Sequence, residues 1–354
     1  MYPIMNRLSQ RLEDLPLSSI AALGQIDKLN GQWIGGLNLS PQTLNQLKRT
    51  VLATSTGAST RIEGVKLSDE EIEAVIRGLG SQKLLDRDSQ EVKGYFEVLD
   101  TIFESWDDVE FTENNIKYLH KELLKYSTKD ERQRGDYKEY DNRVIATDSS
   151  GREIGTIFHT TPPYLTPKEM EELIGWAQLA LAEKNYHPIL VIANFIVEFL
   201  SIHPFSDGNG RLSRILTNLF MLKTGYSYMP YASQEKLIED NKAEYYIALR
   251  KSQSSFKTGQ ETVEPWITFF LQICLTQAEQ AIALLSSESI EKLLSPNQMR
   301  VWDYLLTVDE ATVQNITEVT GVARPTVRQA LERLLSHKKI ERIGQGRTTR
   351  YRKL

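Results

Sequence analysis

The feature that most constrains this chain is a polar, glycine-rich segment enclosed by two strongly apolar stretches. Residues 203–214 read HPFSDGNGRLSR; they follow PILVIANFIVEFLSI and precede ILTNLFMLKTG. Apolar residues recur at three- and four-residue steps on both sides, which predicts two buried helices. A polar loop between such helices is unusual. For a string of this length we favour a functional site over the alternative, a surface turn with a capping aspartate and exposed arginines.

The glycines and arginines of this loop suit an anion. Gly208 and Gly210 permit backbone conformations that bring N–H groups close to a ligand. They lie just before a helix N-terminus, where free N–H groups and the helix dipole favour negative charge. Arg211 and Arg214 add two guanidinium groups that are three residues apart and therefore on one helix face. The segment predicts a phosphate-binding cradle.

Two further side chains of the loop indicate group transfer. Asp207 can ligate Mg²⁺ together with phosphate oxygens, and His203 can act as a general base near neutral pH. An anion cradle, a metal-binding carboxylate, a base and two arginines together predict phosphoryl or nucleotidyl transfer, in which catalysis is mainly positioning and charge stabilisation.

The same segment resembles the signature of the Fic family (filamentation induced by cAMP), H-x-F-x-[D/E]-G-N-G-R-x-x-R, with every specified position matched. The resemblance implies a mainly α fold, a Fic-type helical bundle, and the transfer of AMP from ATP to a hydroxyl of a protein. It implies that His203 deprotonates the accepting Ser, Thr or Tyr, and that Asp207 holds Mg²⁺ on the α- and β-phosphates.

The resemblance also assigns the contacts to ATP. Arg211 would steady the phosphates, and Arg214 would meet the γ-phosphate. The remaining contacts would come from the anion hole of Gly208, Asn209 and Gly210, and from an adenine pocket lined by Asn241, Tyr245 and Tyr246. For the two tyrosines the alternative is a place in the core, because aromatic residues at helical spacing are usually buried.

A second short pattern supports the first. Ser40-Pro41 is a helix-start pair, and the helix that it predicts runs towards Glu63, with Gly64 as terminator. Residues 59–64 read STRIEG and resemble the family's inhibitory pattern, [S/T]-x-x-x-E-[G/N], which begins here at Ser59. The resemblance implies that Glu63 pairs with Arg214 and excludes the γ-phosphate. In some members this glutamate also helps to remove AMP, and the sequence leaves that point open.

Two short β-favouring runs, at 143–145 and 154–158, flank a polar turn at 148–151 and predict a hairpin. It resembles the family's flap, which aligns the target segment by strand addition. The alternative is an ordinary surface hairpin. The flap residues would be Ile154, Gly155, Thr156, Ile157 and Phe158.

The last part of the chain is strongly basic. Residues 321–354 hold ten basic and two acidic side chains and carry +8; the whole chain carries −5, so the rest carries −13. Helix candidates at 297–306, 312–320 and 325–337, followed by a β-rich tail, predict a winged helix-turn-helix. Such a charge favours DNA as a partner; a protein-interaction module or a solvated tail is the alternative. The DNA contacts would be Arg324, Thr326, Arg328, Gln329, Arg347 and Arg350.

Three regions follow from these patterns. Residues 1–70 form an N-terminal Fic-associated region with the inhibitory helix, and the pairs Asn30-Gly31 and Gly35-Gly36 predict loops within it. Residues 71–283 form the Fic catalytic core, and residues 284–354 form the winged helix-turn-helix domain.

The cysteine count and the apolar segments indicate the cellular compartment. The single cysteine, Cys274, cannot form an intramolecular disulfide, which fits a reducing compartment. The first residues lack the apolar stretch of a signal peptide, and no window approaches the roughly 18 apolar residues of a membrane span. We expect a cytoplasmic protein with no membrane partner, and the resemblance allows a homodimer.

Two functions from different classes remain. The first is a self-inhibited protein adenylyltransferase that uses ATP and Mg²⁺, modifies a protein target or itself, and carries a DNA-binding-like domain. The alternative is a transcription regulator that uses the Fic fold to sense a nucleotide or a partner. The intact His203 and Asp207 favour the enzyme, because a sensor needs no base.

Overall fold

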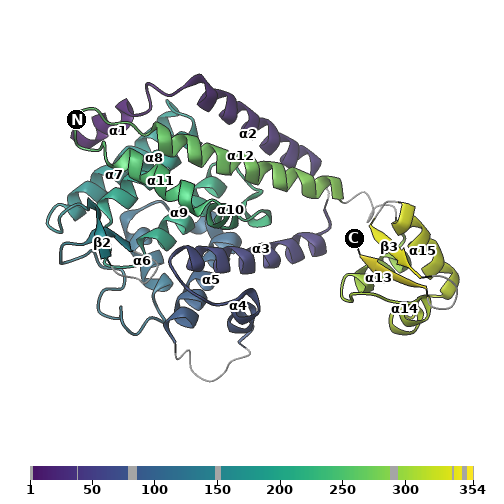
Figure 1. Ribbon diagram of the computed structural model, residues 1–354. Helices are drawn as coiled ribbons and strands as arrows, with labels where there is room; N and C mark the ends of the chain where they lie inside the picture. The colour runs from purple at the N-terminus through teal and green to yellow at the C-terminus, as the bar shows by residue number, and fades with distance from the viewer. Residues whose placement is uncertain are drawn as a thin grey trace. The chain divides into compact units, whose positions relative to one another are not determined.

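The computed structural model describes residues 3–37, 39–78, 86–147, 153–287, 294–336, 339–344 and 349–353. The chain divides into two units, Met1–Ile282 and Ala283–Leu354. Figure 1 shows the first as a mainly helical body with a small hairpin, and the second as a small domain of helices and strands. The predicted mainly α fold is confirmed.

The helices of the first unit are α1 (Pro3–Gln10), α2 (Leu17–Gly36), α3 (Pro41–Ile62), α4 (Asp69–Ile76), α5 (Arg87–Ser105), α6 (Glu113–Leu123), α7 (Thr166–Glu183), α8 (Pro188–Ile202), α9 (Asn209–Lys223), α10 (Gln234–Asp240), α11 (Lys242–Gln253) and α12 (Glu264–Ser287). Almost every side chain of α8 and α9 is buried. These two helices therefore form the centre of the body, as their apolar sequences predict, and the loop between them is held from both sides.

Helix α3 begins and ends where the sequence indicates. The Ser40 hydroxyl accepts a hydrogen bond from the N–H of Thr43, which satisfies one free donor of the first turn. At the other end Glu63 caps the helix, and Gly64 adopts a φ of +104°, which lets the chain turn away. Helix α3 packs against α5 and α10. The capping position places Glu63 at the end of a helix whose C-terminal half is largely buried.

The expectation of loops at Asn30-Gly31 and Gly35-Gly36 is wrong. Helix α2 runs without interruption through Gly31 and Gly35. Its Ile26 and Trp33 side chains are fully buried, whereas a Cβ on either glycine would meet open space. Burial of one apolar face outweighs the cost of about 1 kcal/mol that each glycine adds to a helix.

The predicted hairpin is confirmed. Strands β1 (Arg143–Thr147) and β2 (Glu153–His159) pair antiparallel, with Val144 opposite Phe158 and Ala146 opposite Gly155. The register shifts twice along the pair. The expected turn at 148–151 lies outside the described residues, as do the side chains of the flap.

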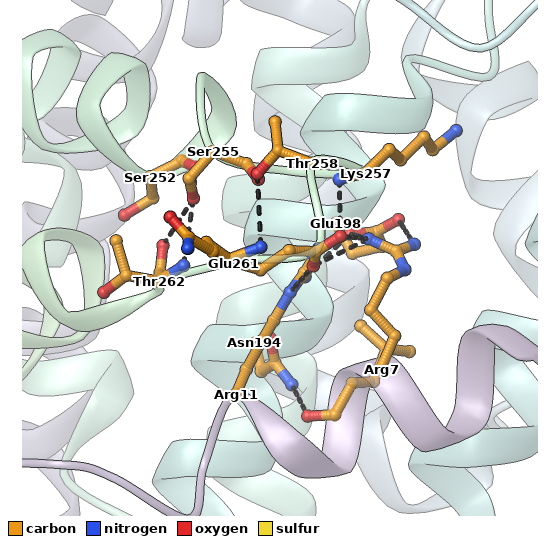
Figure 2. A network of polar contacts seen from close by, with 12 residues as sticks. Arg7, Arg11, Asn194, Glu198, Ser252, Ser255, Lys257, Thr258, Glu261 and Thr262 are labelled. Atoms are coloured by element: carbon orange, nitrogen blue, oxygen red, sulfur yellow. Dashed lines mark hydrogen bonds and ion pairs between the residues drawn. The ribbon is translucent and has the colours of Figure 1, made fainter.

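A buried ionic network ties α1 to the centre of the body (Figure 2). The Arg11 guanidinium lies 2.8 Å from the Glu198 carboxylate on α8 and 2.5 Å from that of Glu261. Arg7 reaches the same two carboxylates at 2.6 and 3.1 Å. Burial opposes ionisation, but Arg11 and Arg7 together hold the pKa of Glu198 below its usual range. Two cations for two anions make this a balanced charge cluster in the core.

Helix α12 corrects the expectation about apolar windows. The stretch Glu264–Leu285 has a mean hydropathy of 1.3, and by length and composition it could cross a membrane. Its Trp266, Ile267 and Phe270 side chains are buried within the protein. Core helices pass the same test, so one helix of this kind is weak evidence for a membrane.

The second unit has its own core. It consists of α13 (Pro296–Leu305), α14 (Val313–Thr320), α15 (Arg324–Ser336) and the antiparallel strands β3 (Ile340–Ile343) and β4 (Arg350–Lys353). Val301, Ile316, Val327 and Leu331 are among the buried residues that join the three helices. Three helices followed by a two-stranded hairpin form the predicted winged helix-turn-helix arrangement.

Candidate active site

The loop between α8 and α9 is fixed at both ends by left-handed backbone conformations. His203, the residue after α8, has a φ of +54°, and Gly208, the residue before α9, has a φ of +80°. The Asn209 side chain closes the loop: its Oδ1 accepts from the Phe205 N–H at 3.0 Å, and its Nδ2 donates to the Phe205 carbonyl at 2.8 Å. A histidine with positive φ is uncommon. The loop thus holds the imidazole in one place.

A second histidine, His120, packs against the loop. The buried His120 ring on α6 stacks on Phe205 with centroids 3.8 Å apart. Its Nδ1 accepts from the Gly135 N–H, which leaves Nε2 as the donor to the Asp207 carbonyl, each at 3.0 Å. Burial lowers the pKa of His120 to about 4, so the ring stays neutral. The sequence analysis missed this role, because nothing local to α6 indicates that its histidine lies under a loop 87 residues away.

His203, the expected base, is half-buried. Its Nδ1 lies 3.4 Å from the Leu200 carbonyl, which can only accept. The proton therefore belongs on Nδ1, and Nε2 keeps its lone pair. Burial, followed by the charge of Lys138, lowers the pKa of His203 to about 4. The imidazole is neutral at physiological pH, which is the state that proton abstraction needs.

Asp207 is held as a carboxylate. Its Oδ1 accepts from the Gly208 N–H at 2.6 Å and from Arg211 at 3.1 Å, and its Oδ2 accepts from Arg87 at 2.8 Å. Burial opposes ionisation, but Arg211, the Gly208 amide and Arg87 hold the pKa of Asp207 below its usual range. The side chain is 30% exposed and Arg87 is 49% exposed. Because Arg87 is exposed to solvent, it can move away and leave Asp207 Oδ2 free to bind another ligand.

Arg211 faces inward. Its guanidinium, 2% exposed, lies 2.9 Å from Glu91 on α5 and 3.1 Å from Asp207. The structure thus places Arg211 beside the loop, where it orients Asp207.

Arg214 is bound to the end of α3. Its Nε donates to the Ser59 hydroxyl at 2.7 Å, and its Nη2 donates to the Ser59 carbonyl at 3.0 Å and to Glu63 Oε1 at 2.8 Å. Burial works against the charge, but Glu63 raises the pKa of Arg214. Within the described part of the chain, the buried Nη1 has no hydrogen-bond partner.

The Glu63 carboxylate also covers the cradle. A Cβ added to Gly210 would collide with Glu63 Oε1. The carboxylate therefore lies directly over the first turn of α9, where the backbone N–H groups favour an anion. The structure brings together the two patterns found in the sequence, although Glu63 and Arg214 are 151 residues apart.

The expected adenine contacts separate into two groups. Tyr245 is 3% exposed and packs against Trp266 and Phe269, with ring centroids 5.8 and 5.9 Å away. Asn241 and Tyr246 are exposed. Tyr245 is therefore a core residue, as the alternative interpretation held, whereas Asn241 and Tyr246 are accessible to a ligand.

In the second unit, Arg324, Arg328 and Gln329 are exposed at the start of α15, and Thr326 is half-buried. Arg350 pairs with Glu310, and Arg347 lies outside the described residues. Four of the six expected DNA contacts thus share one helix end.

The chain resembles known proteins in two places. Residues 110–221 match the Fic/DOC family, and residues 301–354 match a C-terminal domain described as that of a DIP2311-like transcriptional regulator. A Fido domain-containing protein of Dictyostelium discoideum is 33% identical over 34% of this chain and 81% of its own length. A probable protein adenylyltransferase of Aquifex aeolicus is 33% identical over 24% of this chain, which spans only 25% of that protein.

Solved structures share the fold. A Fic family protein from Desulfovibrio desulfuricans matches over 96% of this chain and 97% of its own, with a TM-score of 0.64 and 23% identity. A Fic domain-containing signalling protein from Bacteroides thetaiotaomicron matches over 75% and 98%, with a TM-score of 0.59 and 22% identity.

Proposed function

Because this chain belongs to the Fic/DOC family, we propose that it is a self-inhibited protein adenylyltransferase. It would transfer AMP from ATP to a hydroxyl of a protein, its own included. The observation that carries the proposal is the neutral His203, whose Nε2 lone pair is free, in the same loop as the ionised Asp207 and the cradle of α9.

The chemistry is a displacement at the α-phosphorus of ATP. A hydroxyl oxygen of the target forms a bond to this phosphorus while His203 Nε2 takes the hydroxyl proton. The bond from the phosphorus to the bridging oxygen of the β-phosphate breaks, and pyrophosphate leaves. Backbone N–H groups at the start of α9 stabilise the charge that develops on the phosphate oxygens.

Asp207 suits Mg²⁺ that arrives with ATP. Mg²⁺ is usually held by one or two carboxylates together with substrate phosphates and waters. Among the described residues, no three His, Cys, Asp or Glu side chains are grouped to hold a metal by themselves. The single, ionised and partly exposed carboxylate fits a metal shared with the nucleotide. Once bound, Mg²⁺ would neutralise phosphate charge.

Self-inhibition follows from competition for Arg214. The γ-phosphate of ATP needs the guanidinium that Glu63 and Ser59 now occupy. The Glu63 carboxylate also lies against Gly210, within the cradle. With Glu63 in place, ATP would bind without its γ-phosphate seated, and the α-phosphorus would be misaligned.

The test incubates the protein with Mg²⁺ and ATP labelled at the α-phosphate. We compare the wild type, Glu63→Gly and His203→Ala, and expect label on protein that is strongest in Glu63→Gly and absent in His203→Ala. Absence of label from Glu63→Gly would refute the proposal. Label from γ-labelled ATP alone would identify a kinase.

The regulator remains the second candidate, favoured by the match of residues 301–354 to a transcriptional-regulator domain and by the exposed start of α15. A gel shift at two salt concentrations tests it with Arg328→Ala and, as control, Arg300→Ala on α13. Phosphate contacts predict binding that weakens steeply with salt. ATP binding without protein labelling would favour the sensor over the enzyme.

A further inference from the structure

One buried lysine near the candidate site has no role in the proposed reaction. Lys138, between α6 and β1, is 3% exposed. Its ammonium group donates to three oxygens: Asn142 Oδ1 at 2.7 Å, Thr160 Oγ1 at 2.8 Å and the Ile202 carbonyl at 3.0 Å. None of these partners is a carboxylate. A buried cation without an ionic partner is costly, so its position needs an explanation.

Two of the three oxygens lie at the two ends of the hairpin, and the third lies just before the loop that carries His203. Asn142 directly precedes β1, Thr160 directly follows β2, and Ile202 directly precedes His203. One ammonium group therefore joins both legs of the hairpin to the last residue of α8. All three of its donors are used, so the junction is geometrically determined.

Backbone and amide contacts reinforce the same junction. The Lys138 N–H donates to the Pro204 carbonyl at 2.9 Å, within the loop. The Asn142 amide donates to the Phe205 carbonyl at 3.0 Å. The Thr160 hydroxyl also contacts the Asn142 side chain. The base of the hairpin is thus fixed to the last residue of α8 and to Pro204 and Phe205 of the loop that carries His203.

We propose that Lys138 is a positioning residue, which fixes the base of the hairpin to the backbone on either side of His203, at Ile202 and Pro204, so that a hydroxyl aligned on the flap lies within reach of the imidazole. The inference rests on the proposed function. A hairpin that adds a strand of the target can only deliver the hydroxyl if the distance from hairpin to base is constant. Misplacement by about 1 Å can cost as much as a hundredfold in rate.

The charge of Lys138 also acts on His203. It opposes protonation of the imidazole, whereas Glu63 and Asp207 favour it. Lys138 in turn faces Asp141 and Glu169, which favour its charge, and Lys257, which opposes it; burial lowers its pKa to about 8. A lysine that only filled space would leave the titration of His203 unchanged, and this difference gives the proposal a second readout.

The experiment uses the full chain with Glu63→Gly. Lys138→Met removes the charge and the donors but keeps the length of the side chain, and Lys138→Arg keeps the charge. Lys28→Met, on the exposed face of α2, is the control. For each variant we measure the melting temperature, ATP affinity by calorimetry and the rate of AMP incorporation.

We expect Lys138→Met to bind ATP as the parent does but to incorporate AMP at least about tenfold more slowly. Lys138→Arg should recover most of the rate, and Lys28→Met should equal the parent. An unchanged rate in Lys138→Met overturns the proposal. So does a loss of rate that is matched by a loss of ATP affinity, since that indicates general damage to the site.

Two measurements keep the test valid if Lys138→Met folds poorly or if AMP is never transferred. Thr160→Val removes only the hairpin hydroxyl, and we expect a severalfold slower transfer with unchanged ATP affinity; an unchanged rate counts against the proposal. The pKa of His203, followed by NMR without nucleotide, should rise in Lys138→Met. An absence of all ATP binding in the parent would defeat the proposed function, whereas an unmoved His203 titration would defeat the role of Lys138.

Discussion

Arg61 offers a test of how the inhibitory contact is released. This residue lies in the last turn of α3, two positions before Glu63. Its Nε and Nη2 donate to the Glu239 carboxylate on α10 at 2.6 and 3.3 Å, and its Nη1 donates to Asp69 at 2.9 Å. The side chains of Arg61 and Glu239 are 24% and 18% exposed. This pair attaches the end of α3, the proposed inhibitory helix, to α10.

The size of the effect follows from these contacts. An exposed ion pair contributes up to about 1 kcal/mol, and hydrogen bonds to charged groups contribute about 1.5–3 kcal/mol. For a half-buried, two-point pair we take about 1–2 kcal/mol. Ser59 binds Arg214 through both its hydroxyl and its carbonyl, so full release of Arg214 requires the end of α3 to move. Arg61→Ala should therefore raise basal activity by about fivefold to thirtyfold.

The assay is AMP incorporation from α-labelled ATP at saturating Mg²⁺. Arg61→Ala should lie between the wild type and Glu63→Gly, and adding Arg61→Ala to Glu63→Gly should change nothing further. Arg77→Ala is the matched control, because Arg77 makes a similar pair with Glu73 on the exposed face of α4. If Arg61→Ala keeps the wild-type rate while Glu63→Gly is active, only the glutamate side chain moves, and the reasoning about the helix end is wrong.

Three further predictions address the inhibitory contact and the core. Ser59→Ala removes one of the three acceptors of Arg214, so AMP incorporation should rise by less than in Glu63→Gly; an equal rise would contradict the geometry. Glu198→Ala leaves buried arginines short of a partner and should cost about 3–5 kcal/mol, lowering the melting temperature by roughly 10 °C, whereas a change within about 2 °C would show that the network is neutral. Because Glu198 has a lowered pKa, its contribution is present above the ordinary glutamate pKa and is lost as the pH falls through the folded value. His120 has a folded pKa of about 4, below its unfolded value, so stability should fall between pH 6.5 and 4; a plot of melting temperature against pH should be flatter for His120→Gln, and an identical slope would refute the assignment.

Local signals predicted the elements that local chemistry determines. The Ser40-Pro41 pair and Gly64 marked the ends of α3, and the periodic apolar residues marked α8 and α9. Helix α2 was missed because its glycines are tolerated only through the burial of Trp33, a tertiary effect.

The residues of the candidate site likewise fall into those that local sequence patterns identify and those that they do not. The loop residues and Glu63 could be identified from two motifs. Their supports could not: Arg87 binds Asp207 across 120 residues of sequence, and neither motif includes His120 or Lys138. Supporting residues of this kind are set by the packing of several helices, and a single sequence carries no local record of that packing.

The absence of a side chain at Gly210 limits which substitutions this position can accept. The room above that backbone is filled by an acidic group from α3, and even one methyl would collide with it. The proposed site for the phosphates of the nucleotide is the same space, so a larger residue at position 210 would displace both Glu63 and the nucleotide. Under the proposed function, substitution of Gly210 would therefore not yield an unregulated enzyme, whereas substitution of Glu63 would.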